Sequence, residues 1–307
     1  MKQNYKHPIK ALSLALALVA CLGAFASCGK KEEIAPPQMA EELLQFDISQ
    51  RARDIKAQSK NEDVVGWIYI PTLEIDDPVV YSKDNNNYQR NKLDGSWDYF
   101  GEYFVDMDNI GAIEGTRDSL DKQTVLYGHN VYNGKKNKTY WQGHVIPDYS
   151  VDKVPVDFEN GEKFARLFQL KDKEIAEKTP YIYFSTDDEE MAWEIFAVYY
   201  TDINSFSRWN GYETMSTDKG MMNVVSDSIA KSIFDYGVSV SESDKILTLS
   251  TCSYIEGADN HDLRFHVCAR LVKEGEEFKE SLSLKENEKR IDMREKALLY
   301  PVSPASR

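Results

Sequence analysis

Residues 245–252 (KILTLSTC) and 264–272 (RFHVCARLV) are two short runs rich in aliphatic side chains, and the loop 253–263 joins them. In the second run, every other residue from Phe265 to Leu271 is apolar. This period of two is typical of a β-strand with one buried face. We therefore expect the two runs to form an antiparallel pair of strands.

Further runs of the same kind precede this pair along the chain. They are GWIYI (66–70), PVVY (78–81), TVLYGH (124–129), YIYFS (181–185) and EIFAVYY (194–200). Many short strands with turn-rich connections favour a barrel or a sandwich over alternating βαβ units. The fold class predicted from these runs is mostly β.

Two segments show helical spacing instead. Residues 39–58 contain no Gly or Pro, and their apolar residues recur at helical intervals, which predicts an amphipathic helix. A second apolar face runs from Met222 to Tyr236, and Gly237 after it predicts the end of that helix. The segment 274–299 is crowded with Glu and Lys, which predicts a solvated helix or tail.

Composition excludes several classes of protein. The chain of 307 residues has 37 Lys and Arg against 51 Asp and Glu, a net charge of −14. Such an acidic chain lacks the electrostatic footprint of a non-specific nucleic-acid binder, so no nucleic-acid partner is expected. Apolar residues make up 42%, as in globular proteins, and four cysteines are too few for a disulfide scaffold.

The N-terminus has the features of an export segment. Residues 1–10 carry three lysines and no acidic residue, and residues 11–27 carry no charge. As a helix, the uncharged run spans roughly 25 Å, so an export signal and a signal anchor both fit. FASCG (25–29) resembles a bacterial lipoprotein box, in which lipid is attached to the cysteine, although Phe25 stands where Leu is usual. We expect a domain outside the membrane and tethered to it, through lipid on Cys28 or through an uncleaved anchor.

The exported part holds two cysteines, Cys252 and Cys268. If the last two strands pair antiparallel, Cys252 lies opposite the region near Arg264. Cys268 is then about 13 Å further along the strand, beyond the ~7 Å Cα separation that a disulfide allows. Cys252 is therefore predicted to be a free thiol at a strand end, and Cys268 an inert residue within a strand.

A nucleophilic thiol needs an acid or base partner and a group that stabilises the developing oxyanion. His129 ends an apolar strand, and alternation directs Arg264 away from the buried face of its own strand. These residues predict a Cys-His-Arg site, with an edge-strand salt bridge as the alternative for Arg264. A metal site at His261, His266 and Cys268 is disfavoured because the spacing matches no common zinc motif, and the last two fit an exposed strand face.

The chain resembles the class B sortases, and the resemblance covers most of residues 62–273. The run DKILTLSTC (244–252) followed by LRFHVCARLV (263–272) resembles the catalytic end of that class. The segments that match it in order and spacing are GWIYIPTLEIDDPVVYSKDNNNY (66–88), YGHN (127–130), FARLFQLKDKEIAEKTPYIYFST (164–186) and KSIFDYGVSV (231–240). The resemblance implies an eight-stranded sortase β-barrel with N-terminal helices and an inter-strand helix.

The resemblance also implies roles for individual residues. Cys252 is similar to the family's nucleophile, His129 to its acid/base, and Arg264 to its oxyanion-stabilising or substrate-positioning residue. Positions similar to substrate-groove residues are Asn85, Tyr127 and Ser250. No metal or organic cofactor is implied. Unperturbed pKa values near 8.5 for Cys and 6.5 for His would make the thiolate–imidazolium pair a minority form at neutral pH.

The implied function is that of a membrane-tethered cysteine transpeptidase on the extracellular face of the cell membrane. Its partners would be secreted proteins with a C-terminal sorting signal and an amine of a peptidoglycan cross-bridge or a pilin. Cys252 would cleave a Thr-X bond and hold the product as a thioester. A hydrolytic cysteine peptidase with the same site and a non-catalytic sortase-like surface lipoprotein remain alternatives. A papain-like enzyme is disfavoured because its Cys precedes its His in the chain, whereas here the order is reversed.

The expected organisation is a signal or anchor segment at 1–28, a linker and N-terminal helix at 29–61, the catalytic barrel at 62–273 and a charged C-terminal tail at 274–307. Residues 131–163 form a longer and more polar segment than class B sortases normally have. Because this segment follows His129 directly, it is expected to shape the entrance of the groove, or else to be a solvent loop.

Overall fold

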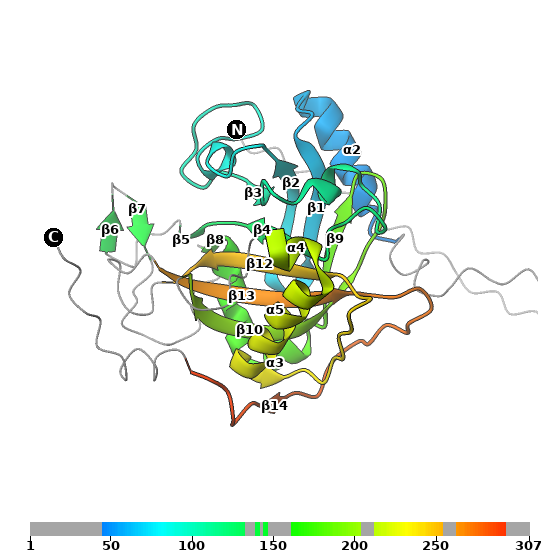
Figure 1. Ribbon diagram of the computed structural model, residues 1–307. Coiled ribbons are helices and arrows are strands. Elements are labelled where there is room, and N and C mark those ends of the chain that lie inside the picture. Colours follow the sequence, from blue (N-terminus) through cyan, green and yellow to red (C-terminus); the bar gives the residue numbers. More distant parts are fainter. Residues whose placement is uncertain are drawn as a thin grey trace, which may run out of the picture. The chain divides into compact units, whose positions relative to one another are not determined.

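The computed structural model describes residues 45–132, 139–141, 144–146, 161–203, 212–253 and 262–292, all within one compact unit. At its centre is a closed barrel of strands in the order β1-β2-β3-β4-β12-β13-β10-β9 (Figure 1). The bounds of these strands are Val64–Ile70 (β1), Ile75–Tyr81 (β2), Tyr103–Val105 (β3), Gln123–Tyr127 (β4), Tyr181–Thr186 (β9), Trp193–Asp202 (β10), Ile246–Cys252 (β12) and Leu263–Leu271 (β13).

The barrel is mixed. The β2–β3 and β4–β12 pairs are parallel, and the other neighbours in the barrel are antiparallel. The eight-stranded barrel expected from the sequence is confirmed, and every run singled out as a strand overlaps one. The run 124–129 was expected to be a strand up to His129, but β4 ends at Tyr127. Strand β3 was missed because three residues are too few to show a period.

Smaller elements surround the barrel. The α-helices are Ile48–Ser59 (α2), Lys173–Glu177 (α3), Tyr212–Ser216 (α4) and Asp218–Lys231 (α5). The 3-10 helices are Pro71–Leu73, Asn87–Gln89, Ile110–Ile113 and Phe164–Lys171. A separate sheet, in the order β6-β7-β5-β8, is made of Asn130–Tyr132 (β5), Thr139–Trp141 (β6), His144–Ile146 (β7) and Gly161–Lys163 (β8). The described parts of the polar segment 131–163 therefore form strands.

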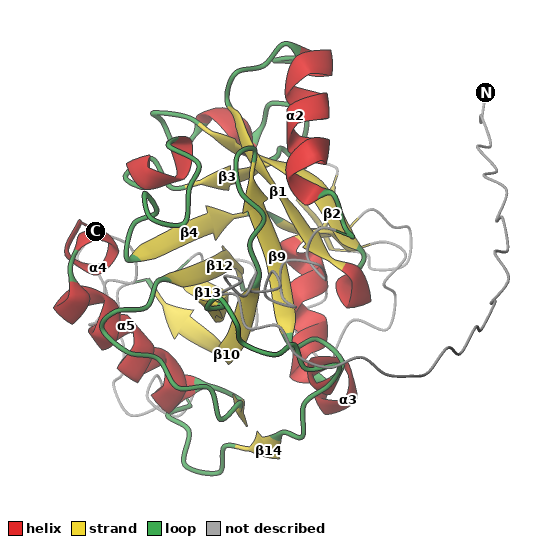
Figure 2. Cartoon of the chain, turned by 90° about the vertical axis from the view of Figure 1, so that its right-hand side faces the viewer, coloured by secondary structure: helices red, strands yellow, loops and turns green. Residues whose placement is uncertain are grey.

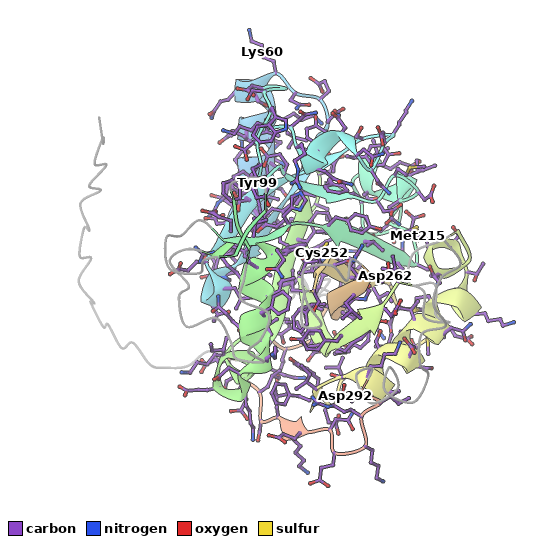
Figure 3. The ribbon with its side chains drawn as sticks, turned by 90° about the vertical axis from the view of Figure 1, so that its left-hand side faces the viewer. Lys60, Tyr99, Met215, Cys252, Asp262 and Asp292 are labelled. Atoms are coloured by element: carbon purple, nitrogen blue, oxygen red, sulfur yellow. The ribbon has the colours of Figure 1, made fainter. Side chains whose placement is uncertain are left out.

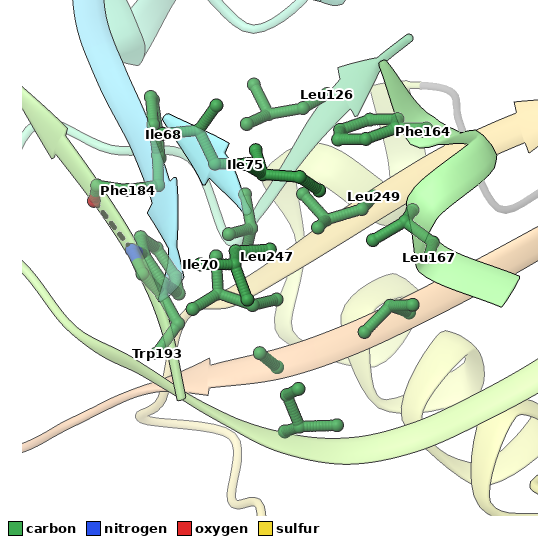
Figure 4. Close-up of a cluster of buried hydrophobic side chains, with 14 of the residues drawn as sticks. Ile68, Ile70, Ile75, Leu126, Phe164, Leu167, Phe184, Trp193, Leu247 and Leu249 are labelled. Carbon is green, nitrogen blue, oxygen red and sulfur yellow. Dashed lines mark hydrogen bonds between the residues drawn. The ribbon is translucent and has the colours of Figure 1, made fainter. Parts of the chain in front are cut away.

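The barrel interior is filled by aliphatic and aromatic side chains from all sides (Figure 4). Leu247 and Leu249 of β12 pair with Ala269 and Val267 of β13 in this core, and all four are fully buried. The 3-10 helix Phe164–Lys171 closes one end of the core. Alternate residues of β12 and β13 thus point inward, as their apolar periodicity predicts.

Helix α5 ends earlier than its sequence pattern suggested. Thr217 caps its start by accepting a hydrogen bond from Gly220 N at 3.0 Å, but the helix ends at Lys231. The backbone N–H of Ile233 donates to Val198 O at 2.8 Å, so the chain is pinned to β10 instead of continuing the helix. The prediction of Gly237 as its C-cap is wrong. This glycine, with φ of 65°, follows the short strand β11 (Phe234–Asp235).

The segment 274–292 also differs from the expected solvated helix. It contains no helix, and its strand β14 (Lys285–Glu286) pairs with β11 between α3 and α5 (Figure 2). Its backbone binds both helices, since Leu282 N donates to Glu177 O at 2.7 Å and Ile291 N donates to Ala230 O at 2.8 Å. Leu284 is buried in the core. This part of the charged tail is therefore a strap that holds α3 and α5 in place.

The helix predicted over 39–58 is α2, which begins only at Ile48: residues 45–47 are not helical, and residues 39–44 lie outside the described residues. The segment 1–28, with Cys28, also lies outside them. In the part of the chain that the structure describes, there is no helix with the length and apolar character needed to span a bilayer.

Candidate active site

At one side of the barrel, β4 and β12 end and β13 begins. Cys252, the last residue of β12, pairs with Arg264 of β13, and Ser250 of β12 pairs with Tyr127 of β4. His129 follows β4 by two residues. The antiparallel register thus places Cys252 opposite Arg264, as the sequence predicted.

A pocket of about 420 Å³ opens at these strand ends, and Cys252 is visible there in Figure 3. Its walls contain all six residues that the sequence proposed for catalysis or substrate binding, together with five others. The lining residues are Asn85, Gln89, Phe104, Tyr127, Gly128, His129, Ile203, Ser250, Thr251, Cys252 and Arg264.

Hydrogen bonds fasten the end of β4 to the end of β12. Thr251 Oγ1 donates to Gly128 O at 2.8 Å, and Asn130 Nδ2 donates to Cys252 O at 2.9 Å. Gly128 is required by close packing, because a Cβ there would lie 2.7 Å from a Tyr103 ring atom. These contacts fix the backbone on both sides of His129 relative to the Cys252 thiol.

His129 is held at one ring nitrogen. Its Nε2 lies 2.8 Å from Gln89 O and 2.6 Å from Arg90 Nη1. Burial, and then the positive charge of Arg90, lower the pKa of His129 to about 4, although the Gln89 carbonyl opposes this shift. The imidazole is therefore neutral at pH 7, and this environment does not favour a thiolate–imidazolium pair.

The opposite wall of the pocket is organised by a buried carboxylate, Asp106. Its Oδ2 accepts hydrogen bonds from Tyr127 Oη at 2.6 Å and from Asn85 Nδ2 at 3.2 Å. Asn85 Oδ1 in turn accepts from Met107 N at 2.8 Å. Asn85 and Tyr127, two of the residues proposed for substrate binding, thus belong to one hydrogen-bond network. Ser250, the third, is buried, and its hydroxyl has no partner among the described residues.

The second cysteine lies away from this pocket. Cys252 and Cys268 are both free thiols, and Cys268 pairs with Thr248, four residues before Cys252 on β12. Cys268 and His266 have no exposed surface, because α5 and the Tyr199 side chain of β10 cover them. The expectation that both lie on an exposed strand face is wrong, since the polar face of β13 is buried by a helix.

Several residues that contact the pocket-lining side chains were not singled out from the sequence. Asp106 follows a three-residue strand, Gln89 contributes its backbone carbonyl, and Arg90 lies in a polar loop, so periodicity gave no signal for them. Asn130 was part of the quoted YGHN motif but received no role. Within the described ranges, no three His, Cys, Asp or Glu side chains gather closely enough to hold a metal ion.

A thiol, an imidazole and a guanidinium that share one pocket at the end of a mixed barrel are the groups of a cysteine enzyme that transfers acyl groups. The chain is 28% identical over 206 residues to sortase B of Listeria monocytogenes, covering 67% of this chain and 68% of that protein. It is 23% identical over 248 residues to sortase B of Staphylococcus aureus, covering 79% and 86%. No protein-family model matches it.

The fold is shared with solved structures of the same family. The crystal structure of Clostridium perfringens sortase B superposes with a TM-score of 0.52 at 24% identity, covering 71% of this chain and all of that one. The similarities in sequence and fold support a class B sortase, a kind of cysteine transpeptidase.

Proposed function

We propose that this sortase cleaves a Thr-X bond in the sorting signal of a secreted protein and joins the new carboxyl end to an amine through a thioester on Cys252. The observation that carries the proposal is the register of β12 and β13, which sets Cys252 opposite Arg264 in a pocket that His129 also lines.

In the first half-reaction, Cys252 Sγ attacks the carbonyl carbon of the Thr residue. The thiol proton passes to the neutral His129, and Arg264 stabilises the negative charge on the carbonyl oxygen. His129 then gives this proton to the leaving amine as the C–N bond breaks. The products are a peptide amine and a thioester on Cys252, with His129 neutral again.

In the second half-reaction, an acceptor amine attacks the thioester carbonyl. His129 accepts the proton that the amine loses, and the proton returns to the Cys252 sulfur as the C–S bond breaks. The new amide is released, and the enzyme regains its starting state. A neutral His129 suits this half-reaction because an imidazole with its lone pair free can act as the base.

The substrate classes follow from the family and from the pocket. Solved structures with this fold include a Staphylococcus aureus sortase B–substrate complex and a sortase B complexed with triglycine, each with a TM-score of 0.51. For this chain we propose a peptide partner bound along Asn85, Tyr127 and Ser250, and an acceptor amine from a peptidoglycan cross-bridge or a pilin. The segment 131–163 begins two residues after His129, so we place the acceptor side there.

We further propose that the enzyme works on the extracellular face of the cell membrane. The uncharged run 11–27 behind a basic N-terminus supports export and tethering. N-terminal mass spectrometry of protein from a native host distinguishes the two anchors. A chain that starts at a modified Cys28 indicates lipidation, and a chain that keeps residues 1–27 indicates a signal anchor.

The test incubates the full-length protein with sorting peptides of the NPxTx type and a panel of amines: oligoglycine, stem peptides with diaminopimelate, and lysine. A ligated product that rises with amine concentration, and that Cys252→Ala and Arg264→Ala both lose, supports transpeptidation. Hydrolysis alone with every amine indicates a peptidase. The absence of a thioester with every sorting peptide indicates a binding module.

A further inference from the structure

Exposed apolar side chains gather in the connection between β3 and β4. Among the described residues, the large apolar side chains with substantial exposure are Trp97, Met107, Ile110, Ile113 and Ile229. Three of them, Met107, Ile110 and Ile113, are 42%, 62% and 46% exposed and come from the short segment 107–113. Ile110 and Ile113 begin and end a 3-10 helix, in which residues three apart lie on one face. We call these three side chains the apolar ridge.

The residues between the ridge side chains hold this segment firmly. Asn109 is buried and binds β4 twice, since its Oδ1 accepts from Val125 N at 2.8 Å and its Nδ2 donates to Gln123 O at 2.7 Å. Ala112, between the two isoleucines, is buried in the barrel core. The ridge is therefore fixed in place before any partner arrives, and a preorganised apolar surface loses little conformational freedom on binding.

The ridge is continuous with the pocket wall that Asp106 organises. Met107 directly follows Asp106, and its backbone N–H donates to Asn85 Oδ1 at 2.8 Å. The carbonyl oxygen of Met107 accepts from Tyr81 Oη at 2.9 Å. A peptide that passes Asn85 on its way out of the pocket therefore meets the ridge next.

The distance from the pocket to the ridge matches an extended peptide of a few residues. Asn109 binds Gln123 at the start of β4, and the pocket lies at the other end of this strand, at Tyr127. At about 3.3 Å per residue these two ends are about 13 Å apart, which about four extended residues cover. The proposed function places Thr of the peptide at Cys252, with the residues before it along the pocket. Residues that precede the sorting pentapeptide therefore reach the ridge.

The exposed charges around the ridge are acidic. Asp108, Glu114 and Asp118 are exposed, and the one basic residue in the sequence 106–121 is Arg117, which forms an ion pair with Glu189. An anionic membrane surface and a second copy of this acidic chain are both repelled by such a surface. A peptide segment with basic residues is attracted to it.

We propose that the apolar ridge binds the part of the substrate protein that precedes the sorting pentapeptide, and that it prefers a segment with both apolar and basic residues. The inference rests on the proposed function, because that function places the pentapeptide in the pocket. Apolar side chains of the segment cover Ile110 and Ile113, and its basic side chains lie near Asp108 and Glu114. The pentapeptide thus sets the bond that is cleaved, and the ridge adds selectivity among substrate proteins.

The test measures KM and kcat for thioester formation by the full-length protein with four peptides. The first is a sorting pentapeptide of the NPxTx type alone. The others carry two leucines and two lysines before it, glycines and serines before it, or the leucines and lysines after it. Leucines and lysines before the pentapeptide should lower KM about 10-fold, because the leucines bury apolar surface on the ridge. The other two extensions should leave KM within about 2-fold of the pentapeptide alone.

Variants of the full-length protein locate this preference. The double variant Ile110→Ser and Ile113→Ser should reduce it from about 10-fold to about 2-fold or less. The double variant Asp108→Asn and Glu114→Gln should weaken it about 3-fold, as should about 0.5 M NaCl, because exposed charges are screened by salt. Ile229→Ser is the matched control, since Ile229 is 44% exposed on α5, and it should keep the full preference.

The proposal is overturned if the leucine and lysine extension leaves KM unchanged in the wild type, or if the preference survives in the double isoleucine variant. It also fails if that variant keeps the preference but loses self-association in sedimentation, or binding to phosphatidylglycerol vesicles. In those cases the ridge belongs to a second copy or to a membrane. Thermal unfolding checks the fold of the double variant, and Ile110→Ser alone carries the comparison if the double variant is unfolded.

Failure of the proposed function is distinguishable from failure of this inference. If no sorting peptide forms a thioester, the proposed function fails, and fluorescence anisotropy of the labelled peptides still measures binding. Tighter binding of the leucine and lysine peptide than of the glycine and serine peptide, lost in the double isoleucine variant, then supports the ridge. Equal binding of the two peptides overturns it. If the pentapeptide alone is acylated normally and the extension has no effect, the function stands and the ridge proposal fails.

Discussion

The outer face of the β12–β13 pair has two ends with similar chemistry and opposite surroundings. At one end, the open end, Cys252 and Arg264 line a pocket. At the other, the covered end, Thr248, His266 and Cys268 lie under α5 with almost no exposed surface. Each end has a thiol and a basic side chain, so the residue types alone do not separate them.

Cover by a helix is what distinguishes the two ends. Met221 and Val225 of α5 pack against Cys268, and Ser228 Oγ lies 3.6 Å from its sulfur. Burial raises the pKa of the Cys268 thiol and lowers that of His266 well below its ordinary value. Both groups are therefore uncharged at pH 7 and closed to peptides. Strand alternation identifies a face, but the packing of other elements decides which part of that face can react.

The largest expected difference concerns the two thiols. Cys252→Ala should abolish thioester formation with a sorting peptide, because the variant has no sulfur at this position to form the C–S bond. Cys268→Ala should keep the reaction, because its sulfur contacts only buried side chains. Intact-mass spectrometry of the acylated protein measures both. Loss of acylation in a folded Cys268→Ala protein would contradict the assignment of the open end.

Two arginines of β13 give the next comparison. Arg264→Ala should reduce the acylation rate about 10²- to 10³-fold, the usual effect of removing an oxyanion donor, with little change in stability. Arg270 instead donates to the buried Glu194 at 2.8 Å. Arg270→Ala should leave the reaction intact but cost about 3 kcal/mol of unfolding free energy in urea, because Lys279 alone then neutralises Glu194. If Arg264→Ala instead lowered the unfolding free energy and Arg270→Ala lowered the acylation rate, Arg264 would be a structural residue.

Most of the barrel could be predicted from the sequence, because most of its strands are long enough to show alternation of apolar residues. The register of β12 and β13 could also be predicted, because a single loop joins them as an antiparallel pair. All six proposed site residues line one pocket. They could be predicted because they lie at or near strand ends, or in segments that resemble class B sortases. The contacts that organise them could not be predicted. Asp106 and Arg90 act through loop geometry, and Gln89 acts through a backbone carbonyl that no side-chain pattern reveals.

The sequence was misleading about secondary structure in two segments, although 274–292 is largely exposed as its charge suggests. Segment 274–292 is charged, yet backbone hydrogen bonds and Leu284 bind it to the body of the protein. The apolar face that predicted a helix up to Gly237 includes Phe234 and Tyr236, which reach the core from an extended segment. In both cases tertiary packing overrides the local pattern.

The two buried histidines should make stability depend on pH. Both have folded-state pKa values below the ordinary 6.5, so as pH falls the unfolded chain takes up the proton first. His129 should therefore lower the unfolding free energy by about 1.4 kcal/mol per pH unit below 6.5, or about 2 kcal/mol at pH 5, and His266 should act in the same direction. For His129 this loss levels off near its pKa of about 4.

Urea unfolding of the wild type, His129→Gln and His266→Gln between pH 4.5 and 7 measures these contributions. Carboxylates titrate alike in all three proteins, so the difference in slope reports one histidine. Each histidine variant should lose the part of the pH dependence of the unfolding free energy that its histidine contributes. An unchanged slope in His266→Gln would indicate that the covered end admits water.

The smallest effect is expected at the pocket wall that Asp106 organises. Asp106→Asn keeps an acceptor for Asp108 N, which donates to Oδ1 at 2.9 Å, but it replaces Oδ2 with an amide that cannot accept from Asn85. The Tyr127 hydroxyl, which also donates to Oδ2, can accept from the new amide instead. Loss of one such hydrogen bond is worth about 1 kcal/mol. We therefore expect KM for a sorting peptide to rise about 3- to 10-fold with kcat nearly unchanged.

The matched variant at the covered end is Thr248→Val, which removes the hydroxyl that accepts from Gln123 Nε2 at 3.0 Å. That variant should change neither constant, because the Thr248 side chain does not reach the pocket. If Asp106→Asn lowered kcat and left KM unchanged, the carboxylate would be acting on the reacting groups themselves, and the wall with Asn85 and Tyr127 would belong to the chemistry of the open end.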